Sequence, residues 1–143
     1  MDYNPWRDAR DNFADYLIDR SRELPAGLKG CVKGKTIYIC RTLNQFSRRT
    51  TLSHELTHIV RGTNHVLYLS QPREELAIDK LVARQFIHID KFIAAVPFGG
   101  KSVPAAIADD LQVDQHTLRT WVHNLTDRER EYIEIRLQER DHP

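Results

Sequence analysis

The segment TLSHELTHIV, residues 51–60, carries two histidines four residues apart, with a glutamate directly after the first. In an α-helix, residues i and i+4 lie on one face about 6 Å apart, so His54 and His58 can point their imidazoles at one metal ion. Glu55 lies about 100° further round the same helix, close enough to hold a water bound to that ion. Two neutral nitrogen ligands and a carboxylate that accepts a proton from the water are what a zinc hydrolase needs.

A third ligand is expected from the next helix, because catalytic zinc typically takes three protein ligands and leaves a fourth position for water. Glu75 and Asp79 are again four residues apart, and the preceding loop is short enough for the two helices to run antiparallel. We predict that Glu75 is the third ligand and that Asp79 accepts the free ring N–H of one histidine. Glu74 competes for the ligand role, but choosing it would place Ile78 at the orienting position, so Glu75 is favoured.

The run TLSHELTHIVRG followed by EELAIDKLVARQFI resembles the ImmA/IrrE family of metallo-endopeptidases. Members of this family pair an H-E-x-x-H helix with a downstream stretch that carries a glutamate and, four residues later, an asparagine or aspartate. The run from LPAGLKG to TTLSHE is also similar to actinobacterial and actinophage members, and the resemblance covers roughly residues 14–95. The resemblance implies a Zn²⁺ cofactor that is held by His54, His58 and Glu75. It also implies that Glu55 is the general base and that Asp79 occupies the Asn/Asp position of the family pattern.

Three departures from the family pattern leave the ligands in place: Thr57 stands where glycine is common, Ile78 replaces a usual alanine, and FIHID replaces the usual LLMP end. Family members are cytoplasmic and often lie beside a helix-turn-helix repressor in phages and mobile elements, and several relieve repression by cleaving or otherwise disabling it. The resemblance therefore implies a zinc-dependent endopeptidase that acts on a cytoplasmic regulatory protein such as this kind of repressor. The alternative is a protein that grips the repressor without cutting it and keeps zinc as a structural clip.

Two helices must hold these residues. Apolar residues recur at helical spacing from about Asn44 onward, and Gly62 is a fitting C-terminal stop. Pro72 then stands at the first position of another helix, whose apolar spacing continues to about Ile87. The sequence therefore places the two histidines and the two acids on consecutive helices.

The N-terminal third supplies the remaining elements of the predicted fold. Asn4 and Pro5 open a first helix, whose apolar stripe runs to about Glu23. The segment CVKGKTIYIC predicts a hairpin, which must lean on helices, with a third strand as an option, because two strands alone are marginal in water. We predict an α+β fold, mostly helical, with a small antiparallel β-hairpin or sheet packed on a zincin-like HExxH helix pair.

The chain changes character after residue 98, which divides it into a metallopeptidase core, residues 1–98, and a C-terminal helical segment, residues 99–143. The run AAIADDLQVDQHTLRTWVHNL resembles a helix-turn-helix with its turn near Val113. Three acids, Asp109, Asp110 and Asp114, lie where DNA phosphates would be met and disfavour contact with them. We therefore expect this segment to pack against other helices or to bind a protein partner. DNA binding is the less favoured function.

The composition restricts the class of protein. With 143 residues, 41% hydrophobic and 29% charged, the chain has the balance of a folded domain, and its net charge of +1 creates no global field toward nucleic acid or anionic membrane. The sequence contains no apolar run near 18 residues, and its N-terminus is polar from the second residue. We therefore expect a cytoplasmic protein without a membrane partner.

Two features of a peptidase site stay open at this stage. The edge strand of the hairpin is the expected docking place for an extended peptide, which can add a strand there. A water that attacks a carbonyl also needs a group that stabilises the oxyanion. Spacing does not choose among the candidates, which are Arg48, His65, Tyr68, His88 and His123.

Overall fold

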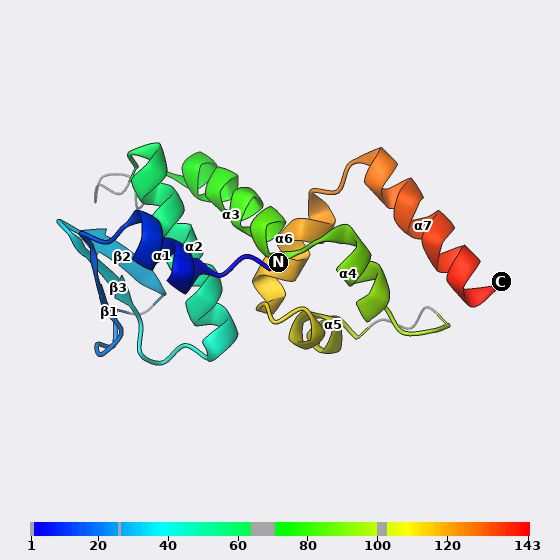
Figure 1. The fold of residues 1–143 in the computed structure, drawn as a ribbon, viewed down its shortest axis with the longest axis horizontal. Coiled ribbons are helices and arrows are strands. Elements are labelled where there is room, and N and C mark those ends of the chain that lie inside the picture. Colours follow the sequence, from blue (N-terminus) through cyan, green and yellow to red (C-terminus); the bar gives the residue numbers. More distant parts are fainter. Residues whose placement is uncertain (1, 26, 64–70, 100–102) are drawn as a thin grey trace. The chain divides into compact units, whose positions relative to one another are not determined.

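The computed structural model describes the chain except for residues 1, 26, 64–70 and 100–102. Helices dominate the described part and accompany a small sheet, which confirms the α+β class (Figure 1). In chain order the elements are α1 (Pro5–Asn12), β1 (Leu17–Asp19), β2 (Gly30–Lys33), β3 (Thr36–Ile39), α2 (Gln45–Arg61), α3 (Pro72–Phe86), α4 (Ile89–Ala95), α5 (Pro104–Asp110), α6 (Gln115–His123) and α7 (Asp127–Asp141). Among the described residues, no helix is long and apolar enough to cross a membrane.

The chain forms two compact units, Met1–Val82 and Ala83–Pro143, and the boundary between them lies within α3. Each unit has its own apolar core. The functional division into residues 1–98 and 99–143 stays a prediction.

The sheet is mixed, with strand order β1-β3-β2, so the prediction of a purely antiparallel sheet was wrong. The hairpin itself is confirmed, because β2 and β3 pair antiparallel with Cys31 opposite Tyr38. The added strand β1 pairs parallel with β3, and Leu17 N–H donates to the Lys35 carbonyl at 2.8 Å. The predicted extension of the first helix to Glu23 was also wrong, because the helix ends at Asn12. Pairing with β3 thus overrides the helical spacing of residues 13–17.

Helix α2 has the predicted bounds and packs against β2 and β3. The Asn44 side chain accepts a hydrogen bond from the Ser47 N–H at 2.9 Å, which satisfies one of the N–H groups exposed at a helix start. Gly62 ends the helix with a left-handed φ of 72°, a conformation that favours glycine. The apolar face of α2 joins the core of the first unit, whose buried members are Ala9, Val32, Ile37, Ile39, Leu52 and Leu56.

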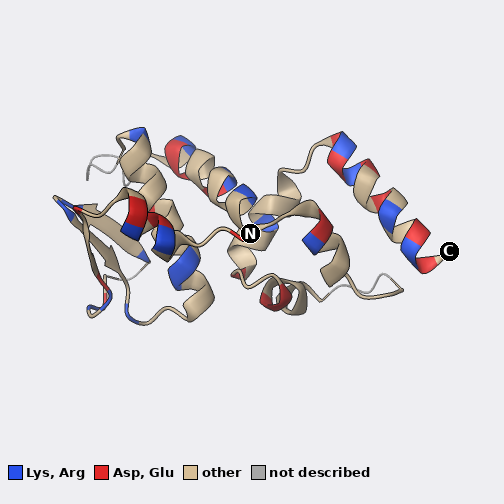
Figure 2. Ribbon diagram, viewed as in Figure 1, with Lys and Arg blue, Asp and Glu red and all other residues tan. Residues whose placement is uncertain are grey.

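The second unit is a set of helices around Trp121, which is 2% exposed. Its α5–α6 connection contains Gln112 at φ 58°, followed by buried Val113 and by Asp114, whose side chain caps α6. The N-cap of α7 forms a capping box with Glu129. Figure 2 shows acidic and basic residues alternating along α7, and acidic residues on α5. Helix capping and apolar packing therefore account for the arrangement of helices within this unit.

Candidate metal centre

Three side chains of the first unit converge on one point: His54 and His58 from α2, and Glu75 from the first turn of α3. The His54 Nε2 lies 2.7 Å from one Glu75 carboxylate oxygen, and the His58 Nε2 lies 2.9 Å from the other. Their possible ligand atoms all lie within 4.8 Å of one another, so the group could hold a metal ion. Ligands about 2 Å from a tetrahedral zinc ion are about 3.4 Å apart, so small side-chain rotations would place these atoms around one ion.

The opposite ring nitrogens of both histidines already have partners. The His54 Nδ1 lies 3.0 Å from the Asp79 carboxylate, and the His58 Nδ1 lies 2.9 Å from the Thr63 hydroxyl. Because each Nδ1 already has a hydrogen-bond partner, each ring presents its Nε2 to the Glu75 carboxylate. This arrangement orients imidazole ligands as metal sites require, since the ring N–H that is not at the metal normally has a partner. The donor set and its orientation therefore fit a zinc ion.

The charges of the cluster stabilise one another. Burial opposes protonation of His54, but its hydrogen bonds to Asp79 and Glu75 outweigh this and raise its pKa to about 10. Burial likewise opposes ionisation of Glu75, but hydrogen bonds from both histidines lower its pKa to about 2. An anionic Glu75 suits its position in the first turn of α3, where the helix dipole favours negative charge.

Glu55 is buried on α2, with 6% of its surface exposed. Burial raises its pKa, while the neighbouring His54 and His58 act in the opposite direction. Strand β2 approaches this part of the helix closely: a Cβ added at Gly30 would lie 2.7 Å from the Thr51 Cγ2 and 3.3 Å from the Glu55 Cγ. Only glycine allows this approach, which brings β2, an edge strand of the described sheet, next to Glu55.

Glu74, the competing ligand, lies outside this cluster. Its carboxylate accepts hydrogen bonds from the Arg61 guanidinium, at 2.8 Å from Nε. This pairing with Arg61 lowers the pKa of Glu74, and hydrogen bonding by the nearby Thr63 contributes to the same shift. The structure thus brings together His54, His58, Glu75 and Asp79, the residues expected from spacing, and their roles stay predictions.

The contribution of Thr63 was missed by the sequence reasoning, although a signal for it existed. Thr63 follows Gly62, and its N–H donates to the His58 carbonyl at 2.9 Å, while the Gly62 N–H donates to the Ile59 carbonyl at 3.1 Å. These two bonds form the Schellman motif that often accompanies a helix-ending glycine. The motif turns the chain back over the last turn of α2, where a hydroxyl at position 63 can reach His58.

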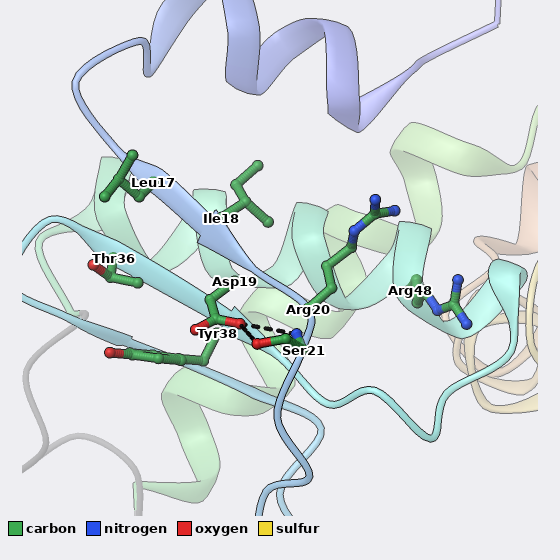
Figure 3. A pocket seen from close by; sticks show the side chains of 8 residues that line it. All are labelled: Leu17, Ile18, Asp19, Arg20, Ser21, Thr36, Tyr38 and Arg48. Atoms are coloured by element: carbon green, nitrogen blue, oxygen red, sulfur yellow. Dashed lines mark hydrogen bonds between the residues drawn. The ribbon is translucent and has the colours of Figure 1, made fainter.

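The oxyanion-stabilising role stays unassigned. His65 and Tyr68 lie outside the described residues. The Arg48 Nε donates to the Leu43 carbonyl at 3.0 Å, and its side chain lines a groove of about 790 Å³ beside β1 (Figure 3). The residues of the metal cluster do not line this groove. His88 accepts a hydrogen bond from the Asp90 N–H at the start of α4, and His123 ends α6, both in the second unit.

No family model, curated protein or solved structure matches the chain.

Proposed function

We propose that the protein is a zinc-dependent endopeptidase whose metal is held by His54, His58 and Glu75. One observation carries the proposal: both imidazoles present Nε2 to the Glu75 carboxylate while their Nδ1 atoms are bonded elsewhere. Two histidines and one glutamate, with another glutamate directly after the first histidine, form the ligand and base set of known zinc peptidases. The zincin-like packing of the helix pair belongs to the same proposal.

Glu55 is the proposed acid–base residue. When bound, zinc would lower the pKa of a coordinated water and polarise the scissile carbonyl. Glu55 takes the proton from the attacking water and passes it to the leaving amine. Burial suits this task, because it raises the carboxyl pKa and so makes the carboxylate a better proton acceptor.

Strand β2 is the proposed docking edge for the substrate. It lies at one side of the three-stranded sheet, and Gly30 keeps it next to Glu55. An extended peptide that added to this edge would form main-chain hydrogen bonds and run past the proposed base. The other edge, β1, borders the groove that contains Arg48 and none of the metal ligands. The geometry therefore favours β2.

The substrate class rests on the resemblance to the ImmA/IrrE family. We propose a cytoplasmic regulatory protein, such as a helix-turn-helix repressor of a phage or mobile element. An extended segment of such a protein suits the β2 edge, where backbone hydrogen bonds supply affinity without demanding one sequence. The non-cleaving alternative uses the same metal as a clip, and it predicts a closed fourth coordination position instead of one that holds water.

A second candidate function is DNA binding by the α5–α6 pair. The left-handed Gln112 and the buried Val113 form the tight turn that a helix-turn-helix requires, which favours this reading. The exposed acids Asp109 and Asp110 on α5 weigh against contact with phosphates. Binding that weakens steeply with salt would distinguish this function, because phosphate contacts release counterions.

Metal content tests the proposal directly. The parent, Glu75→Ala and Glu23→Ala are purified without a polyhistidine tag, offered zinc, desalted and analysed for bound metal. Glu23 is a suitable control because it is an exposed acid paired with Arg41, away from the cluster. We expect about one zinc ion per chain in the parent and the control, and a loss in Glu75→Ala. A parent that binds no zinc contradicts the proposal.

A further inference from the structure

We propose that Glu74 is a positioning residue of the metal centre, which acts on His58 through the hydroxyl of Thr63 and is itself held by Arg61. This inference rests on the proposed metal function. Four side chains lie next to one another between the two helices. The His58 Nδ1 lies 2.9 Å from the Thr63 Oγ1, and the Arg61 Nε donates to Glu74 at 2.8 Å. Thr63 and Glu74 line the same small pocket together with Arg61, and hydrogen bonding by Arg61, and then by Thr63, lowers the pKa of Glu74. We call these four side chains the Thr63 relay.

The direction of each hydrogen bond follows from the donor inventory. A carboxylate paired with a guanidinium can only accept, so the single hydroxyl proton of Thr63 goes to Glu74. The Thr63 oxygen is then left to accept from the His58 Nδ1–H. That fixes the tautomer of His58 and leaves the Nε2 lone pair for a metal ion.

The two histidines are therefore oriented by different means. His54 meets the Asp79 carboxylate directly, at 3.0 Å. His58 meets a neutral hydroxyl, whose polarity depends on the carboxylate behind it. Hydrogen-bonded groups in such a chain polarise one another, so removing Glu74 weakens the bond between Thr63 and His58.

The relay also joins two helix ends that carry ligands. Arg61 is the last residue of α2, Thr63 directly follows the Gly62 cap, and Glu74 precedes the proposed ligand Glu75 on α3. The Arg61–Glu74 pair uses both carboxylate oxygens, at 2.8 and 3.0 Å from the Arg61 Nε, and the Glu74 side chain is 12% exposed. The Arg61 side chain is 39% exposed, so the restraint on the backbone that places Glu75 opposite His58 comes from the two-point geometry of the pair.

Zinc affinity tests the relay, measured by competition with a chelating dye. Partners of this kind typically contribute about 10–100-fold to metal affinity, so we expect a loss of that size in Thr63→Val and in Glu74→Ala. Thr63→Ser keeps the hydroxyl and should stay within about threefold of the parent. Because the two residues act in series, the double variant should bind zinc about as weakly as the weaker single variant. Glu23→Ala serves as the matched control.

The outcomes separate this inference from the proposed function. A parent without zinc affinity overturns both. A parent that binds zinc, together with Thr63→Val and Glu74→Ala variants that bind equally well, overturns the relay alone. Losses that simply add in the double variant overturn the serial arrangement. The melting temperature of each metal-free variant shows whether it folds. Should Glu74→Ala fail to fold, Glu74→Gln replaces it, with an expected loss of at least about threefold, because a neutral amide attracts the Thr63 hydroxyl less strongly.

Discussion

The two compact units bury polar side chains for different reasons. Among the described residues, α2 of the first unit contains five of the six buried polar or charged side chains: Thr50, Thr51, Ser53, Glu55 and His58. The second unit contains one, Thr117, whose hydroxyl and N–H both bond to the Asp114 cap of α6. Burying a polar group is costly unless it is bonded, and local capping accounts for Thr117. Capping does not account for a buried glutamate beside a buried histidine.

The candidate site and the larger apolar core lie in different units. The second unit buries apolar residues around Trp121 and keeps its charges in surface pairs such as Arg84–Glu129. Within the described part of the chain, the first unit has a smaller apolar core of six buried residues, against ten in the second unit, but also places two imidazoles and a carboxylate within reach of one ion. Changes in the first unit's cluster should therefore alter function, and changes in the second unit's core should alter stability.

The largest effect is expected for Glu55→Gln. Losing a general base typically costs about 10²–10⁴-fold in rate, so peptide cleavage should fall by about a thousandfold, while the three proposed zinc ligands remain. The measurement compares the zinc-loaded parent and variant on a quenched peptide library, with zinc content measured on the same samples. Equal cleavage by the two proteins would show that Glu55 is not the base, and the polar burial of α2 would then need another explanation.

Next comes Trp121→Ala in the second unit. Removing a fully buried tryptophan side chain should lower the free energy of unfolding by about 3–5 kcal/mol, as measured by urea denaturation. Phe98→Ala is the aromatic control: Phe98 is 73% exposed and contacts the Arg140 guanidinium, so it should cost about 1 kcal/mol or less. Zinc affinity of the folded Trp121→Ala protein should match the parent. A loss of zinc affinity in this variant would show that the core of the second unit also affects the candidate metal site of the first unit.

The smallest effect concerns the pH dependence of stability in the second unit. The hydrogen bond from Arg84, supported by the Thr126 N–H, lowers the pKa of Glu129 to about 2. A depressed carboxyl pKa stabilises the fold above its unfolded value, near 4.3, and this contribution is lost as the pH falls toward 2. Because the pair is partly exposed, we expect it to contribute less than about 1 kcal/mol.

Glu129→Gln isolates this charge, since glutamine can still complete the capping box. Urea denaturation at several pH values between about 5 and 2 should show a shallower loss of stability in the variant than in the parent. Identical pH profiles would mean that the ion pair adds nothing to the second unit, whose stability would then come from apolar packing alone.

The sequence by itself determined the features that depend on residues near one another in the chain. Asn44 and Gly62 mark the ends of α2 through capping, and the spacing of His54 and His58 fixes their shared helix face. Of the two acids in the first turn of α3, only Glu75 has an acid four residues later, which predicts that Glu75 and not Glu74 faces the histidines. A helix has a fixed period, so these relations follow from local geometry alone.

Only the tertiary structure decided the relations between distant segments. The helical spacing of residues 13–17 gave no sign that β1 would pair with β3, because strand pairing depends on a partner almost twenty residues away. The close approach of Gly30 to Glu55 depends on how β2 packs against α2. The ion pair between Arg61 and Glu74 depends on where α3 lies relative to α2. The spacing of two histidines predicts that they share one helix face, but the hydrogen bonds that orient them come from residues that only folding brings near.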